Sequence, residues 1–531
     1  MKKRETRLSR LERSRKKLEL FCSQTRLEPR ESHGFTKGNQ INRIDPERIL
    51  RSRTMPIRYS NLPENPFMVA CVFEDLKKRW DKDNILKATK EIFHLDPIET
   101  EGQFPWAAIT VMVPGEADLE CARTSKLTGS AVLTNDSDFI LYDLGSHGSV
   151  LFLDSVELTE WDRSRPAESK ITARRLCPAS LVGRLGIENI RLFAYELNQN
   201  PHLRLPELIR RSKHAYRSLE LSLEYRCFNE EYDCAFGDQG KRADTMHSPQ
   251  GLDPRISEIF MQYQLRDIYS LGNVAHMYFP ILNEDHSRRC AWDEGRLYRT
   301  LGYSIINVSH AIPGKFEFVD EYVRRGGRIV KDRINLGPEE WIAAEMKLLC
   351  ERLKSAQAAF NGNISSPCFW RLFALCDIYG LAMRNTVLLD VRRLCRFFKF
   401  GYMGQKLEWT DIHLYARIDA VLYSIRVLKQ FLELDLMVEE SALRVRSTVA
   451  ALPPLHAMMK SRCEMTEEFP GEEVLRGFFG SLCGAYTKDF GATQALPSGQ
   501  NESTRQSRGE WDDIQSSDKR ISNPYEILSL E

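Results

Sequence analysis

Two pairs of acidic residues follow short apolar runs in the first third of the chain, and they constrain its fold more than any other feature. Residues 107–113 and 131–134 are apolar and contain β-branched side chains, which predicts two buried strands. Residues 116–126 between them predict a helix, which Thr128 and Gly129 end. A strand, a helix and a strand within about thirty residues are typical of a βαβ unit with parallel strands.

The acids fall where a unit of this kind collects its ligands. Glu116 and Asp118 follow the first predicted strand, and Asp136 and Asp138 follow the second. Open parallel sheets bind ligands beyond the carboxyl ends of their strands. Carboxylate oxygens suit Mg²⁺ and Mn²⁺, and two such ions can clamp the attacking and leaving oxygens of a phosphodiester. We therefore interpret the acids as a metal site. A helix start and a solvated turn are the alternative, since Asp favours turns.

These segments carry a resemblance to a known family. The sequence Pro-Gly-Glu-Ala-Asp-Leu-Glu-Cys-Ala at 114–122, followed by Leu-Thr-Asn-Asp-Ser-Asp-Phe at 133–139, resembles the internal nuclease region of the flap-endonuclease/XPG superfamily. Residues 1–215 resemble its Asteroid-domain branch most. The resemblance implies an α/β PIN-like domain with a parallel sheet, followed by a mostly α-helical region. It also implies a Mg²⁺-dependent (or Mn²⁺-dependent), structure-specific nuclease that acts on DNA or RNA, with Glu116, Asp118, Asp136 and Asp138 as catalytic metal ligands.

The start of the chain departs from the family pattern. Family members begin with a strand that carries a metal-binding Asp, and a second strand ends in Phe-Asp-Gly before a basic helix. Residues 1–18 resemble that basic helix, so we expect the chain to begin at an internal Met with both N-terminal strands missing, with a genuine shortened isoform as the alternative. Their absence would leave an unpaired strand edge. Two metal ions are therefore expected only in a full-length form, and we expect nuclease activity of this chain to be impaired or lost.

A second departure lies further along the chain. Active family members carry another metal-ligand Asp in a Gly-Ser/Asn-Asp-Tyr motif, which leads into a helical turn that grips duplex DNA. The matching segment here is 192–203, in which Glu196 takes the position of that Asp. Glu196 therefore joins the predicted metal site, and an exposed helix position is its alternative. Residues 198–202 replace the glycine-rich turn, which argues against duplex binding by the family's route.

The first 17 residues form a strongly basic segment, with nine Lys or Arg residues against two acids. Lys3, Arg7 and Arg10 lie roughly one helical turn apart. The resemblance implies that they bind substrate phosphates, and such binding would be sensitive to salt. A nuclear localisation signal and a solvated helix face are the alternatives.

Composition limits the number of domains and the classes of function that we expect. The 531 residues, 42% of them hydrophobic, are enough for two or three domains. We expect an incomplete PIN-like domain at 1–215, a helical Asteroid-type domain at 216–460 and a tail at 461–531 that is disordered after about residue 488. The net charge of +1 does not favour a dedicated nucleic-acid binder. The 13 cysteines include no Cys-x-x-Cys pair, which argues against a zinc ribbon.

The sequence contains no apolar leader or membrane-spanning run, so we expect an intracellular protein of the nucleus or cytoplasm with no membrane partner. Its oligomeric state stays open. Two functions from different classes remain: a metal-dependent nuclease, and a non-catalytic PIN-like scaffold that binds nucleic acid or protein through its helical half.

Overall fold

The fold is known from a computed structural model, which divides the chain into two compact units. The described residues of unit 1 lie between 4 and 93, 106 and 112, and 251 and 479, and those of unit 2 lie between 113 and 232. These bounds differ from the predicted boundaries at 215 and 460. The structure describes the following residues: 4–25, 63, 65–93, 106–113, 117–159, 170–214, 222–232, 251–266, 272–360, 362–383, 391–437, 439–458 and 471–479.

Unit 1 contains a small mixed sheet that the sequence analysis did not predict. Strand β6 (Val274–Tyr278) pairs in parallel with β7 (Phe318–Arg325), and β7 pairs antiparallel with β8 (Arg328–Asn335). The helix α13 (Arg296–Val308) follows the one-turn 3₁₀ helix η7 (Ala291–Asp293). Arg299 on α13 is fully buried and donates to both carboxylate oxygens of Glu321 on β7, at 2.8 and 2.9 Å. This buried pair fixes the helix against the sheet.

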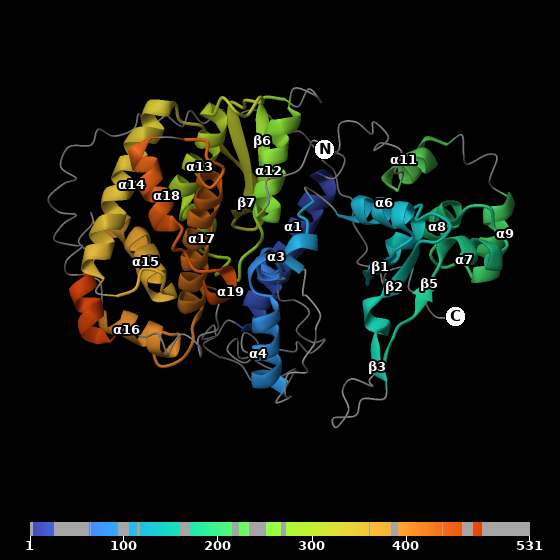
Figure 1. Ribbon diagram of the computed structural model, residues 1–531, viewed down its shortest axis with the longest axis horizontal. Helices are drawn as coiled ribbons and strands as arrows, with labels where there is room; N and C mark the ends of the chain where they lie inside the picture. The colour runs from blue at the N-terminus through green and yellow to red at the C-terminus, as the bar shows by residue number, and fades with distance from the viewer. Residues whose placement is uncertain are drawn as a thin grey trace, which may run out of the picture. The chain divides into compact units, whose positions relative to one another are not determined.

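The rest of unit 1 is helical. The 24-residue helix α17 (Trp409–Leu432) is almost entirely buried, and α13, α15 and α18 pack against it (Figure 1). The remaining helices, in chain order, are α1 (Arg4–Thr25), α3 (Met68–Lys78), α4 (Lys82–Phe93), α5 (Trp106–Ile109), α12 (Pro254–Leu265), α14 (Glu339–Ala359), α15 (Pro367–Met383), α16 (Val391–Phe400), α18 (Glu440–Val449) and α19 (Leu455–Met458).

A buried ion network joins distant parts of unit 1. Arg426 on α17 donates to both carboxylate oxygens of Asp253, each at 2.9 Å, and to Glu74 on α3 at 3.0 Å. The second oxygen of Glu74 accepts the backbone N–H of Leu455 at 2.7 Å. All three charged side chains are nearly inaccessible to solvent. A buried charge is tolerated only when it is paired, so this network specifies how these segments meet.

Unit 2 holds the acidic segments on a second small sheet. Strand β1 (Ala131–Thr134) pairs in parallel with β2 (Ser149–Phe152), and β2 pairs antiparallel with β5 (Arg175–Leu176). A separate hairpin joins β3 (Glu157–Thr159) and β4 (Lys170–Thr172). The connection from β1 to β2 runs through a 3₁₀ helix, η2 (Ser137–Leu141), and a further 3₁₀ turn, η3 (Leu153–Ser155), follows β2.

The described part of unit 2 also contains five helices: α6 (Asp118–Thr128), α7 (Pro178–Leu185), α8 (Ile190–Gln199), α9 (Leu205–His214) and α11 (Leu223–Glu231). Gly129 ends α6 in the left-handed conformation, as predicted, with φ of 69°. The core of the unit gathers Phe139 and Leu141 of η2 with Phe193 of α8 and Tyr232. The 3₁₀ turn that carries two of the predicted acids is therefore anchored by its own apolar side chains.

One predicted strand is wrong. Residues 106–109 form the short helix α5, and 110–113 have no regular structure, so the predicted strand at 107–113 does not form. Helix α5 packs on α3, where Lys77 donates to the carbonyl of Ala107 at 2.7 Å. Two successive alanines favour a helix, and a strand needs a neighbour to pair with. Among the described residues, β1 pairs with β2 alone, so the parallel pair is β1–β2.

Candidate metal centre

Asp136 and Asp138 are held by the turn that follows β1. The backbone N–H of Asp136 donates to Oγ1 of Thr134 at 3.0 Å, and Oδ1 of Asp136 accepts the N–H of Asp138 at 3.0 Å. Asp136 is thereby the N-cap of η2, and Asp138 lies in its first turn. The turn chemistry that Asp favours is thus present. The same turn also carries a cluster of negative charge, which turn formation alone does not require.

Besides Asp136, the side chains of Asp118, Glu231 and Tyr232 act on the carboxylate of Asp138. Burial, and then the negative charges of Asp136, Asp118 and Glu231, raise the pKa of Asp138 to about 6. A hydrogen bond from the Tyr232 side chain acts in the opposite direction. Asp118 is the first residue of α6, so the fold brings both predicted acidic segments to the carboxyl end of β1. Carboxylates so arranged repel one another and attract a cation.

Glu231, the last residue of α11, is a member of this cluster that the sequence analysis missed. Tyr232 follows it and packs edge-on against Tyr142, with ring centroids 5.4 Å apart. A signal for this position was present, because an acid directly followed by tyrosine parallels the Asp-Tyr pair of the family motif. That motif was instead assigned to 192–203, which lies on α8 and the residues just after it, ahead of α11 in the chain.

The other two predicted ligands have different surroundings. Glu196 is buried on α8, where Nδ2 of Asn200 lies 3.4 Å from its Oε2, and it is not among the largest influences on the pKa of Asp138. Glu116 lies outside the described residues. The ligand roles of Glu116, Asp118, Asp136, Asp138 and Glu196 stay predictions. Within the part of the chain that the structure describes, no three His, Cys, Asp or Glu side chains are gathered closely enough to hold a metal ion.

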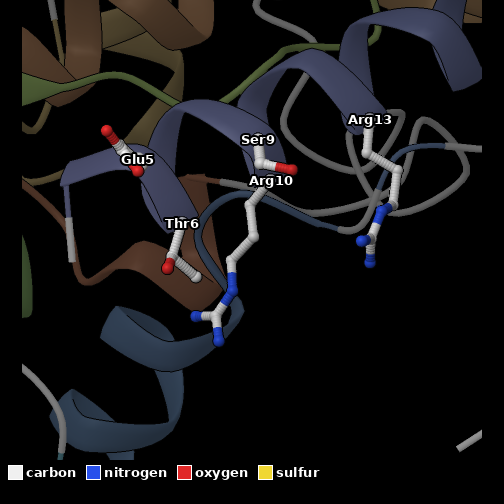
Figure 2. A pocket seen from close by; sticks show the side chains of 5 residues that line it. All are labelled: Glu5, Thr6, Ser9, Arg10 and Arg13. Atoms are coloured by element: carbon white, nitrogen blue, oxygen red, sulfur yellow. The ribbon is translucent and has the colours of Figure 1, made fainter. Parts of the chain in front are cut away.

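The predicted phosphate-binding residues of α1 lie in unit 1 and have divergent environments. Arg7 forms an ion pair with Glu258 of α12, and its guanidinium lies 5.3 Å from the ring centre of Tyr278 on β6. Arg10 is exposed and lines an open hollow together with Glu5, Thr6, Ser9 and Arg13. Figure 2 shows the side chains of Arg10 and Arg13 extending from α1 to the same side. Lys3 lies outside the described residues.

Helix α1 is anchored to unit 1 through its second half. Leu18 and Cys22 are fully buried against Ile281, and the ring of Phe21 meets Trp409 edge-on at 5.5 Å. Near the start of the helix, Arg4 lies over the ring of Tyr322. The face with Arg4 and Arg7 is therefore occupied by the sheet of unit 1.

Comparison with protein families decides the broader identity. A family model described as "XPG domain containing" matches residues 64–336, just over half of the chain. The chain belongs to this XPG-domain family. The match spans the acidic segments, α11 and the sheet of unit 1, so the family's region extends well beyond the segment that first suggested it. Membership indicates a nuclease-type function and a relation to nucleic acid.

Neither a curated protein nor a solved structure matches the chain significantly. None of the helices that the structure describes combines the length and the apolar character that a membrane span requires.

Proposed function

We propose that this XPG-domain protein is a nuclease of the PIN-like, Asteroid type, which hydrolyses phosphodiester bonds of nucleic acid with Mg²⁺ or Mn²⁺. The observation that carries the proposal is the acidic cluster around Asp138, where burial and three neighbouring carboxylates raise its pKa to about 6. Perturbed acids of this kind are typical of functional sites. In an XPG-domain chain, a divalent cation is the partner that best neutralises them.

The residues present fit such an ion in their donor chemistry. Mg²⁺ is usually bound through one or two carboxylates, with water and substrate phosphate completing its shell. Asp136 and Asp138 would supply the carboxylates, and Asp118 and Glu231 would contribute further negative charge, with Glu116 and Glu196 as additional predicted ligands. When bound, the ion would polarise the phosphoryl oxygens and lower the pKa of a bound water.

The chain's own residues orient this site. Asp136 has one oxygen committed to the N–H of Asp138, which limits the directions in which its carboxylate can point. The Tyr232 side chain holds Asp138 through a hydrogen bond. Asp138, with a pKa near 6, is ionised in only part of the molecules at mildly acidic pH. Cation binding is therefore expected to release a proton from it.

Arg10 and Arg13 are the side chains of α1 that we propose to contact nucleic acid. Both line the open hollow on α1, and their side chains extend to the same side of the helix (Figure 2). Arginine binds phosphate through a planar pair of donors. Lys3 and Arg7 were predicted for the same role, and Arg7 would first have to leave Glu258.

The alternative is a non-catalytic scaffold that binds nucleic acid or protein. It is favoured by the absence, among the described residues, of three ligand side chains close enough to hold a metal ion. The two functions differ in what the acids do, because a scaffold would bind oligonucleotides equally well without them.

Cleavage of labelled flap and single-stranded substrates by the purified chain, with Mg²⁺ or Mn²⁺, tests the proposal. We expect weak cleavage, in line with the impaired activity expected of this chain, and Asp136→Ala plus Asp138→Ala should abolish it. Asp143→Asn is the matched control, since this nearby acid pairs with Lys126 at 2.6 Å and should not affect the reaction. Wild-type cleavage by the double variant would refute the metal assignment. Binding without cleavage in both proteins would favour the scaffold.

A further inference from the structure

Arg191 on α8 joins two elements of the acidic cluster. Its Nε donates to the carbonyl of Leu141 at 2.8 Å, and Leu141 is the last residue of the turn that carries Asp138. Its two terminal nitrogens donate to Oδ1 of Asn229 at 2.8 Å and to the carbonyl of Tyr232 at 2.7 Å. All three nitrogens of one guanidinium are thus used between η2 and the end of α11.

The acceptors explain why an arginine is suited to this position. The last carbonyls of a helix lack partners within the helix, and the negative end of the helix dipole favours a cation there. Tyr232 is the C-cap of α11, so Arg191 satisfies one such carbonyl. A planar fork reaches three acceptors in fixed directions, whereas the ammonium group of lysine has no such geometry.

The C-terminal end of α11 is also the end at which charge repulsion acts on this helix. Near its start, Tyr225 packs edge-on against Tyr195 of α8, with ring centroids 5.3 Å apart. At the other end, Glu231 faces the negative charge of Asp138, which favours separation of the two elements. Arg191 acts at this second end and opposes that repulsion.

We propose that Arg191 is a positioning residue, which holds the end of α11 against η2 and so keeps Glu231 and Tyr232 beside Asp138. The role rests on the proposed function insofar as the cluster binds a cation. The clamp itself depends only on the three hydrogen bonds. Its effect is indirect, because Arg191 contacts the backbone and an amide of the two elements.

The experiment compares Arg191→Gln and Arg191→Lys with the wild-type full chain by hydrogen–deuterium exchange and by Mn²⁺ titration. Removing three bonds from a charged donor should speed exchange in 223–231 at least about tenfold. It should also weaken Mn²⁺ binding about five- to tenfold, with Arg191→Lys intermediate in both. Arg175→Lys is the matched control. Arg175 donates to Oγ of Ser149 at 2.8 Å and to the carbonyl of His147 at 3.3 Å, away from α11 in the same unit.

The outcomes separate positioning from a general contribution to folding. Faster exchange confined to α11 and η2 supports the proposal. Unchanged exchange in 223–231, or equal acceleration in α7 and α9, overturns it. Where wild type binds Mn²⁺, unaltered affinity of folded Arg191→Gln also overturns it. Failure of the wild-type chain to bind Mn²⁺ would contradict the proposed function instead, and the exchange pattern would still decide whether Arg191 is the clamp.

Discussion

The backbone N–H of Asp154 donates a hydrogen bond of 2.9 Å to Oδ1 of Asn135. Asn135 follows β1 and Asp154 follows β2, so one side chain ties together the carboxyl ends of the two parallel strands. The acidic turn at 136–138 begins at the next residue. The position of this turn therefore depends on the sheet as well as on the turn's own hydrogen bonds.

The raised pKa of Asp138 predicts an unusual dependence of stability on pH. Because the pKa rises from 3.8 to about 6 on folding, the folded chain binds this proton more tightly than the unfolded chain. The resulting stabilisation is present below pH 3.8 and is lost as the pH rises to about 6. Asp138→Asn should remove this loss and stabilise unit 2 at pH 7.5 by about 2 kcal/mol relative to wild type, since solvent screening at this partly exposed group reduces the roughly 3 kcal/mol of the full shift. Urea unfolding at pH 5 and pH 7.5, without divalent cations, measures the difference.

Asp143→Asn provides a control of opposite sign. Its hydrogen bond with Lys126 lowers the pKa of Asp143, so its carboxylate stabilises the fold above the unfolded-state pKa. Asp143→Asn should therefore lower stability at pH 7.5. A loss of stability in both variants at this pH would contradict the repulsion assigned to the Asp138 cluster.

The salt dependence of oligonucleotide binding should show whether Arg10 and Arg13 of α1 contact phosphates. Arg10→Ala plus Arg13→Ala removes two proposed phosphate contacts. The slope of log K against log salt for a single strand should therefore fall by about 1.4. The control is Arg444→Ala plus Arg476→Ala, which makes the same change in net charge at exposed arginines paired with Glu440 and Glu472. Equal changes of slope in the two double variants would show that the contacts are not on α1.

The buried network of unit 1 should be costly to break. Arg426→Leu leaves Glu74 and Asp253 buried without their cation, which typically costs about 3–5 kcal/mol. Arg444→Ala, which removes an exposed pair with Glu440, should cost less than about 1 kcal/mol. Denaturant unfolding followed by tryptophan fluorescence measures both. Similar losses in the two variants would mean that the buried network is not what joins α3 to α17.

Two helical glycines should respond oppositely to alanine. A Cβ at Gly302 on α13 would lie 2.5 Å from the ring of Phe431 on α17, so Gly302→Ala should destabilise unit 1 by about 1–3 kcal/mol. A Cβ at Gly380 on α15 would meet nothing within 4 Å, so Gly380→Ala should stabilise it by up to about 1 kcal/mol. Thermal unfolding of the two single variants checks the signs. A stabilising Gly302→Ala would contradict the close approach of α13 and α17.

Local patterns predicted the parts of the structure that depend on neighbouring residues. The basic helix at the start of the chain, α6 with its glycine end, the strand β1, and the turn with Asp136 and Asp138 all follow from nearby sequence. The sheet of unit 1 was missed for a physical reason. Strand β7 is buried along most of its length although it contains Asp320, Glu321 and Arg324, whose charges are paired with residues from other elements. Alternation of apolar and polar residues does not reveal such a strand.

The candidate site, too, was predicted only where its residues are close in sequence. Asp118, Asp136 and Asp138 were found because their spacing is local, whereas Glu231 reaches the cluster only through the packing of α11 on α8. The predicted strand at 107–113 was wrong because apolar content alone does not distinguish a strand from a short helix, and the helix that forms there is exposed.

The contact between Glu74 and Arg426 has a consequence for biosynthesis. The two residues are 352 positions apart, and all described residues of unit 2 lie between them in sequence. During translation, the described residues of unit 2 all emerge while α3 still lacks the cation and the helices that complete its surroundings. Closing so long a loop is slow. Until it closes, the apolar surface of the incomplete unit 1 stays exposed, which favours misassembly. Expression at lower temperature or with chaperones should therefore improve the yield of folded chain more than that of unit 2 alone.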